Sequence, residues 1–505
     1  MNWKSAIALA FAACTPGVLA AFGVTTGSGY LSVDTGGGLV FRVSTSSGDI
    51  TSLKYNNIEC QDSSKYTHIG SGLGSATVSY KTSGNYATIT IATSTLTQYY
   101  VAVSGQSAIY IGTYTTAEPS VGELRFIARL SKSALPKGGT AIEGSDVYSL
   151  NGQTRSKFFS SVQFIKDQVH GVTGNGVGVY MVMPGNAYET SGGGPFFRDI
   201  NNQDMNSGHM VTQSFRTGFF GPYAMVFTSG NAPSASLDTS FFANLGIKGY
   251  VAASGRGTVK GTVSGVPSGF TAVVGLDNSA AQYWGTVSGT SYTINGVKPG
   301  TYKATLYKKE LEVGTGSVTV SAGGTATLNL ASTESIKSNI WQIGLPDGTP
   351  SGFLNADKIE SMHPTDSRMS GWGPVTYTIG SSSPSSFPMA QFVAVNNPTT
   401  IKWTATSSQI GARTLRIRTT SSFAGGRPAI KVNNWSSANP AAPTKIDSRG
   451  VTRGTWRGYN QLYEYAIPSG TLVAGSNTIT ISVISGSSGD AFLSPNVVYD
   501  SIELY

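Results

Sequence analysis

Arg125, Lys157 and His209 are the residues of this chain best suited to chemistry, because they bring cationic or titratable side chains into a charge-poor protein. Only 12% of the 505 residues are charged, and there are 4 histidines. A guanidinium can hold a carboxylate, an uncharged amine can take a proton, and an imidazole can donate one. Gathered in one groove, the three groups could carry out an elimination on an acidic substrate.

Taken singly, these residues also have ordinary structural interpretations. Arg125, in a predicted strand, could form a salt bridge, and Lys157 could be a solvated surface lysine. His209 follows Arg198 and Asp199 in a loop-like stretch, and loops carry functional residues more often than their share of the chain. The spacing alone therefore leaves both interpretations open for all three.

The other histidines are interpreted mainly as structural. His68 begins a Gly-rich run, which would let a backbone approach a ligand or another strand closely. His170 and His363 stand in stretches where a structural or solvated role is the simplest interpretation.

Several common catalytic motifs are missing from the sequence. No serine has glycines two positions away on both sides, as the hydrolase elbow requires. There is also no phosphate loop ending in Gly-Lys-Ser or Gly-Lys-Thr, no paired-histidine zinc motif and no calcium loop of the helix-loop-helix kind. The sequence thus argues against nucleotide and zinc chemistry. It indicates no required cofactor, and a structural calcium ion cannot be read from it.

The elements that must position the candidate residues are predicted to be β-strands. Short β-branched and aromatic runs recur between Gly, Ser, Asn and Pro clusters, as in Thr88–Ile91, Val179–Val182 and Thr478–Ile484. The chain has 63 glycines and few helix signals, a composition typical of extracellular β-proteins. We therefore expect an all-β protein built from sandwiches.

The chain divides into a leader and three predicted domains. Lys4, the apolar run 6–13 and Val18-Leu19-Ala20 predict a secretory signal over residues 1–20. Strand patterns change near 246–250, and the polar segment 333–338 indicates a linker, so we expect domains at 21–247, 248–332 and 333–505. The middle domain has a length that suits a seven-stranded sandwich.

The cysteine content, the net charge and the lengths of the apolar runs predict the disulfide bonding, the kind of partner and the absence of a membrane-spanning helix. Cys14 lies in the predicted leader, so Cys60 has no intramolecular partner and is interpreted as a buried small residue. The formal net charge of +8 suits an anionic partner as well as a generic basic surface. No run is long enough to predict a membrane-spanning helix.

Several long runs, in order along nearly the whole mature chain, resemble the rhamnogalacturonan lyases of polysaccharide lyase family 4. They are Thr113–Leu130, Thr154–Phe158, Gly193–Asn201, Met205–His209, Asp238–Phe242, Gly249–Gly257, His363–Met369 and Asp447–Gly454. The resemblance implies an N-terminal β-supersandwich catalytic domain, a fibronectin type III-like sandwich and a C-terminal jelly-roll sandwich similar to carbohydrate-binding modules.

The same resemblance implies cleavage of the rhamnogalacturonan I backbone of pectin by β-elimination, at the α-1,4 bond between rhamnose and galacturonic acid. Arg125, Lys157 and His209 match the family's functional arginine, lysine and histidine. Arg125 would hold the uronate carboxylate, Lys157 would remove the C5 proton and His209 would protonate the leaving oxygen. The reverse assignment, with His209 as base and Lys157 as acid, stays open. Further substrate contacts are assigned to Arg155, Arg198, Arg129 and His68, and no metal is expected.

The chain also departs from the family pattern, which keeps other functions open. Only residues 202–204 separate the Arg-Asp-Ile-Asn run from Met205, where family members carry a longer segment with tyrosines. One alternative is therefore a non-catalytic pectin-binding protein with a degenerate cleft. Another is a glycoside hydrolase, for which Glu123 and Asp199 would be the nearest carboxylate pair.

In the third domain, aromatic and cationic side chains could contact sugar, although most aromatics there are expected in the core. The candidates are Trp372, Trp403, Trp435, Trp456, Tyr459, Arg453 and Arg457. Asn434-Trp435-Ser436 is a glycosylation acceptor sequence. The expected product is a secreted, extracellular monomeric glycoprotein that binds an acidic polysaccharide, without nucleic-acid or membrane partners.

Overall fold

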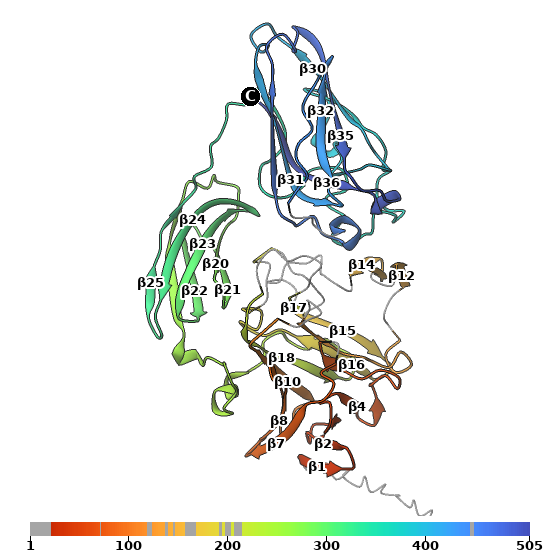
Figure 1. The fold of residues 1–505 in the computed structure, drawn as a ribbon, viewed down its shortest axis with the longest axis vertical. Helices are drawn as coiled ribbons and strands as arrows, with labels where there is room; N and C mark the ends of the chain where they lie inside the picture. The colour runs from red at the N-terminus through yellow and green to blue at the C-terminus, as the bar shows by residue number, and fades with distance from the viewer. Residues whose placement is uncertain are drawn as a thin grey trace, which may run out of the picture.

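The computed structural model is almost entirely β-structure, arranged as three units around a central region (Figure 1). It describes residues 22–70, 72–118, 124–136, 140–144, 147–156, 168–190, 194–196, 204–206, 215–444 and 449–505. Within these ranges the helical segments are short 3-10 turns: η2 (Ser240–Asn244), η3 (Ala253–Gly255), η4 (Pro384–Ser386), η5 (Gly450–Arg453) and η6 (Ala491–Leu493). The all-β prediction is confirmed.

Two large antiparallel sheets form the N-terminal unit. The first has the order β1-β2-β3-β4-β5 and the second the order β15-β16-β18-β10-β9-β8-β7. The strands are β1 (Gly23–Gly27), β2 (Tyr30–Asp34), β3 (Leu39–Ser44), β4 (Ile50–Tyr55), β5 (Ile58–Glu59), β7 (Thr77–Ser83), β8 (Tyr86–Ala92), β9 (Leu96–Val103), β10 (Ala108–Thr115), β15 (Val169–Gly174), β16 (Val177–Val182) and β18 (Gly218–Thr228).

The central strands of the seven-stranded sheet, such as β9 and β10, are buried on both faces. In β9, Tyr100 and Ala102 face the core shared with the first sheet, whereas Tyr99 and Val101 face the opposite side. That second face is covered by Phe241 and Phe242 of η2 and by the chain that follows it. A strand buried on both sides has a continuous run of apolar residues, as β9 has over Tyr99–Val103.

Two small sheets carry the segments around the candidate residues. One has the order β17-β11-β6 and the other the order β12-β13-β14. Their strands are β6 (His68–Ile69), β11 (Leu124–Ile127), β17 (Asp204–Asn206), β12 (Thr140–Glu143), β13 (Val147–Leu150) and β14 (Gln153–Ser156). In Figure 1, β12 and β14 lie on the side of the N-terminal unit that faces the C-terminal unit.

The middle unit packs two sheets, one of order β22-β19-β25 with β26 paired to β19, and one of order β21-β20-β23-β24. This is a sandwich of the expected kind, with eight strands instead of seven because β25 and β26 are two short pieces. They are β19 (Gly257–Ser264), β20 (Ala272–Asp277), β21 (Gln282–Thr286), β22 (Ser291–Val297), β23 (Gly300–Lys308), β24 (Leu311–Val320), β25 (Thr325–Thr327) and β26 (Leu330–Ala331).

The C-terminal unit is a sandwich of two five-stranded sheets. One has the order β27-β36-β31-β34 with β29 paired to β36, and the other the order β28-β30-β35-β32-β33. The strands are β27 (Trp341–Gly344), β28 (Thr376–Thr378), β29 (Ala390–Phe392), β30 (Thr399–Ala405), β31 (Arg413–Phe423), β32 (Arg427–Val432), β33 (Trp435–Ser436), β34 (Gln461–Ile467), β35 (Gly475–Ile484) and β36 (Asn496–Leu504). In the described residues no helix has both the length and the apolar character needed to cross a membrane.

A buried carboxylate joins the N-terminal and middle units. The side chain of Glu189 has no exposed surface, and its oxygens lie 2.7 Å from Arg256 Nη1 and 2.9 Å from Lys298 Nζ. Tyr283 donates a hydrogen bond of 2.5 Å to the same carboxylate. Burial opposes ionisation, but the hydrogen bond from Arg256 and the two positive charges outweigh it and hold the pKa of Glu189 below its ordinary value.

Glu189→Ala is expected to destabilise the protein strongly, because it leaves two buried cations uncompensated. The expected loss is about 3–5 kcal/mol of unfolding free energy, measured by urea titration. Since the folded pKa is depressed, this stabilisation is present above the unfolded pKa of about 4.3 and is lost as the pH falls through the folded value. The control is Glu312→Ala, whose half-exposed carboxylate lies 3.9 Å from Lys303 and should matter by less than about 0.5 kcal/mol.

Candidate active site

The strand that carries Arg125 is the centre of the three-stranded sheet. In β11, Leu124 pairs with Asn206 and Arg125 with Asp204, with an irregularity in register between them. On the other side, Ile127 pairs with His68. The backbone therefore places the strands of Arg125 and His68 next to each other.

The neighbouring strand β17 leads toward His209, since only two residues separate its last residue, Asn206, from that histidine. The register of β11 with β17 thus fixes the start of this segment beside Arg125. Lys157, Arg198 and His209 lie outside the described residues, as does the side chain of Arg125, so their predicted meeting stays a prediction. The same holds for the carboxylate pair Glu123 and Asp199.

Arg155 lies in β14, the strand whose last residue precedes Lys157 in the chain. Its Cα pairs with Tyr148 of β13, and its side chain is exposed and donates a hydrogen bond of 2.7 Å to Gln153. An exposed guanidinium beside the start of the Lys157 segment suits the predicted contact with an anionic substrate. The structure places Arg155 on a different small sheet from Arg125.

His68 and Arg129 lie on adjacent parts of the N-terminal unit. His68 Nδ1 is 3.7 Å from Asp49 Oδ1, and both side chains are 18% exposed. The backbone N–H of Arg129 donates to the hydroxyl of Thr67, and its carbonyl accepts from the amide of Gln61. These contacts tie the chain after β11 to the chain before β6, so Arg129 and His68 belong to one region.

Cys60 is a packing residue, as predicted. Its side chain is completely buried in the main core of the N-terminal unit. Burial, with the nearby charge of Glu59, raises the pKa of the thiol to about 11, so the nucleophilic thiolate does not form near neutral pH.

The two histidines interpreted as structural differ in their surroundings. His170 lies in β15, opposite Met181, and is half-buried. His363 is buried, with its Nε2 atom 3.5 Å from Glu143 of the N-terminal unit. His363 is therefore an interdomain residue and not a solvated one.

The cationic contacts predicted for the third domain are wrong. Arg457 is buried and donates hydrogen bonds of 3.0 Å to Glu310 and to Glu360, so its guanidinium is occupied by the protein's own carboxylates. Arg453 is only 4% exposed. Neither side chain is open to a polymer.

The aromatic candidates of this domain divide as expected between core and surface. Trp403 is buried against Trp341, and Trp372 packs edge-on against Phe392. Trp456 packs against the same core. Trp435 and Tyr459 are half-buried. The sequence does not show which tryptophan side chains face the core, because their burial depends on which edge of the sandwich each loop covers.

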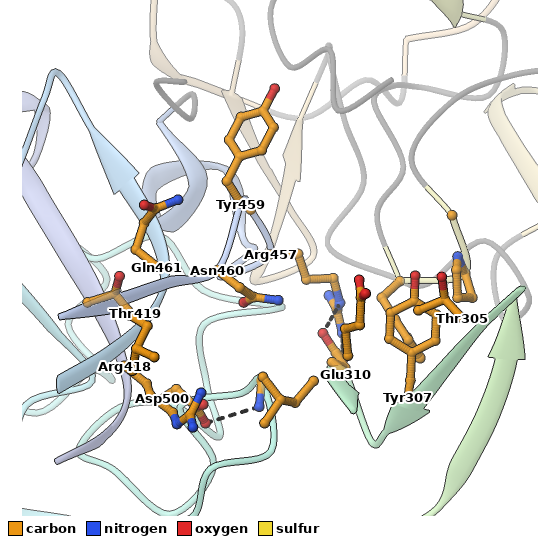
Figure 2. Close-up of a pocket in the computed structure, with 18 of the residues that line it drawn as sticks. Thr305, Tyr307, Glu310, Arg418, Thr419, Arg457, Tyr459, Asn460, Gln461 and Asp500 are labelled. Carbon is orange, nitrogen blue, oxygen red and sulfur yellow. Dashed lines mark hydrogen bonds and ion pairs between the residues drawn. The ribbon is translucent and has the colours of Figure 1, made fainter. Parts of the chain in front are cut away.

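A polar cavity of about 610 Å³ lies where the three units meet (Figure 2). Two of its acidic side chains are bound by the protein: Glu310 pairs with Arg457, and Asp500 accepts the backbone N–H groups of Asp347 and Gly348 at 3.0 Å. Burial is the main reason that the pKa of Asp500 rises to about 8. The cavity thus holds a network that joins the middle and C-terminal units.

Sequence reasoning missed the contacts between the N-terminal and C-terminal units. Glu143 of β12 accepts a hydrogen bond of 2.8 Å from Arg449, which lies 306 positions later in the chain. No local pattern relates residues so far apart.

Among the described residues, no group of three or more His, Cys, Asp or Glu side chains is arranged to hold a metal ion.

Family models match three consecutive segments of the chain. Residues 22–249 match the N-terminal domain of rhamnogalacturonan lyase B, residues 255–328 match domain II of polysaccharide lyase family 4, and residues 339–504 match its domain III.

Curated relatives match over the full length. The chain is 54% identical to rhamnogalacturonate lyase A of Aspergillus aculeatus, over 98% of this chain and 99% of the relative, and 54% identical to rhamnogalacturonate lyase A of Emericella nidulans, over 96% of each. A probable rhamnogalacturonate lyase A of Aspergillus clavatus is 52% identical over all of both chains. That alignment has 529 positions against 505 residues here, so the relative carries segments that this chain lacks. The chain belongs to the rhamnogalacturonan lyases of polysaccharide lyase family 4.

Proposed function

We propose that this protein is a secreted rhamnogalacturonan endolyase. It cleaves the α-1,4 bond between rhamnose and galacturonic acid in the rhamnogalacturonan I backbone by β-elimination and leaves an unsaturated galacturonate end. The observation that carries the proposal is the full-length identity of 54% to an enzyme named rhamnogalacturonate lyase A. All three segments of the chain also match models of the same family.

The reaction begins with a weakly acidic proton. C5 of galacturonate lies beside a carboxylate whose negative charge opposes formation of a second anion. A guanidinium bound to this carboxylate stabilises the enolate-like intermediate, which is the role of Arg125. Lys157 in its neutral form removes the C5 proton, the C4–O bond breaks, and the C4=C5 double bond forms. His209 gives a proton to the departing rhamnose oxygen.

The strand register supports this assignment. Arg125 lies between the strand of His68 and the strand that leads to His209. Lys157 directly follows Ser156, the end of β14, which carries the exposed Arg155. A nearby guanidinium favours the neutral amine, because like charges lower the pKa of a lysine. The arginines assigned to binding of the acidic polysaccharide are Arg125, Arg129, Arg155 and Arg198.

The remaining features fit an extracellular enzyme. The leader over residues 1–20 would direct export, domains at 21–247, 248–332 and 333–505 would form the mature monomer, and Asn434 would be open to glycosylation. No metal is assigned to the reaction, because the guanidinium of Arg125 supplies the positive charge that stabilises the enolate-like intermediate.

Incubation with rhamnogalacturonan I should raise the ultraviolet absorbance of unsaturated uronate ends. New reducing ends without that absorbance would identify a hydrolase. Neither signal, together with retention of the protein on immobilised polymer, would identify a pectin-binding protein.

Lys157→Ala is expected to abolish the absorbance change while the melting temperature stays unchanged, because no base remains to take the C5 proton. The matched control is Lys260→Ala, which removes an exposed lysine from the middle unit and should leave turnover unchanged. Wild-type turnover in Lys157→Ala would exclude Lys157 from the mechanism.

His209→Ala is expected to lose activity on rhamnogalacturonan I but to recover on a galacturonate with 4-nitrophenolate as the leaving group at C4. Nitrophenolate departs without a proton, so the acid becomes dispensable while the base does not. Lys157→Ala should stay inactive on both substrates. If the aryl substrate rescues Lys157→Ala instead, the roles of base and acid are exchanged.

A further inference from the structure

The small sheet β12-β13-β14 is bound to the C-terminal unit, although it belongs to the N-terminal part of the chain. Its central contact is the carboxylate of Glu143. Arg449 Nη1 donates to Glu143 Oε1 at 2.8 Å, and His363 Nε2 lies 3.5 Å from Oε2. The side chains of Glu143 and His363 are 12% and 7% exposed, so water has little access to the carboxylate itself, whereas Arg449 is 39% exposed.

The ring of His363 is oriented for this contact. Its Nδ1 atom lies 2.8 Å from the hydroxyl of Thr365 and accepts the backbone N–H of the same residue at 3.3 Å, and these contacts hold the ring with Nε2 facing Glu143. Burial opposes ionisation of Glu143, but His363, Arg449 and the charge of Arg453 outweigh it and hold its pKa below the ordinary value. Glu143 is therefore an anion held by cationic and donor groups of the C-terminal unit.

Two further contacts hold β14 itself. The backbone N–H of Thr154 donates to the carbonyl of Ser361 at 2.5 Å, a hydrogen bond between main chains of two units. Arg368 Nη2, held by Asp366 at 2.6 Å, donates to the carbonyl of Gly152.

Gly152 lies in the tight turn between β13 and β14. Asn151 and Gly152 both have positive φ, 52° and 74°, as a type I′ hairpin requires. A Cβ atom on Gly152 would lie 2.9 Å from Arg368 Nη1, so the turn and the guanidinium fit closely.

These contacts act on the strand that directly precedes Lys157 in the sequence. β14 ends at Ser156, and consecutive Cα atoms are about 3.8 Å apart, so a shift of this strand carries the Cα atom of Lys157 with it. We propose that the C-terminal unit positions Lys157 through a clamp formed by Glu143, Arg449, His363, Arg368 and the Thr154–Ser361 hydrogen bond. This inference rests on the proposed function of Lys157. Glu143 and Arg368 are positioning residues, since they act on the strand and not on the substrate.

The test compares Glu143→Ala and Arg368→Ala with the wild-type enzyme on rhamnogalacturonan I. Displacing a base by about 1 Å costs up to about 100-fold in rate, so kcat should fall about 10- to 100-fold. KM should stay within about twofold, because a base acts on the transition state and not on ground-state binding. Hydrogen exchange at residues 147–156 should accelerate in both variants. Arg368 is 50% exposed, so Arg368→Ala decides the question even if Glu143→Ala fails to fold.

The matched control is Lys309→Ala, which breaks a 2.9 Å ion pair with Asp347 between the middle and C-terminal units and does not touch β12–β14. Its kcat should be unchanged. Wild-type kcat in Arg368→Ala would overturn the clamp, and so would an equal loss in Lys309→Ala or a rise in KM alone. Activity in Lys157→Ala would instead overturn the proposed function, so the two failures are distinguishable.

Discussion

Ion pairs built on buried or largely buried carboxylates link the three units of this protein. Glu189 joins the N-terminal unit to the middle unit, Arg457 and Glu310 join the middle unit to the C-terminal unit, and Glu143 and Arg449 join the C-terminal unit back to the N-terminal one. Each unit thus contacts both others, and the three contacts close a ring. Because every unit contacts both of the others, no unit can rotate without breaking a contact. If only two of the three contacts existed, the end units could rotate independently.

Buried ion pairs are weak sources of net stability, since desolvation offsets much of their attraction, but removing one member is strongly unfavourable. Here the ion pairs therefore favour one relative arrangement of the three units over others. The effect is large in this chain because charged residues are only 12% of the sequence, so few alternative partners exist for a buried carboxylate. Under the proposed clamp, the position of Lys157 depends on contacts that the C-terminal unit makes with β12–β14.

The fold class was predictable because it is encoded locally. Alternating and continuous apolar runs such as that of β9 identify strands, and Gly and Asn mark turns, as at Asn151 and Gly152. The lone Cys60 was predictable for the same reason. Arg457 was misjudged because its environment comes from another unit, where it meets Glu310 of the turn between β23 and β24. His363 is structural, which is one of the two roles predicted for it, but its partner Glu143 of β12 could not be read from the sequence. Motif resemblance identified Arg125, Lys157 and His209, which no spacing rule would have selected, and it gave no hint of Glu143.

The complete burial of Glu189 also bears on how such an enzyme can change over evolutionary time. A domain whose surface carries a water-excluded anion is compatible only with a neighbour that brings Arg256 and Lys298 to the same place. Recombination that exchanged the middle module for one from an unrelated protein would leave that carboxylate buried without a cation, so we expect selection to favour joint inheritance of the two modules.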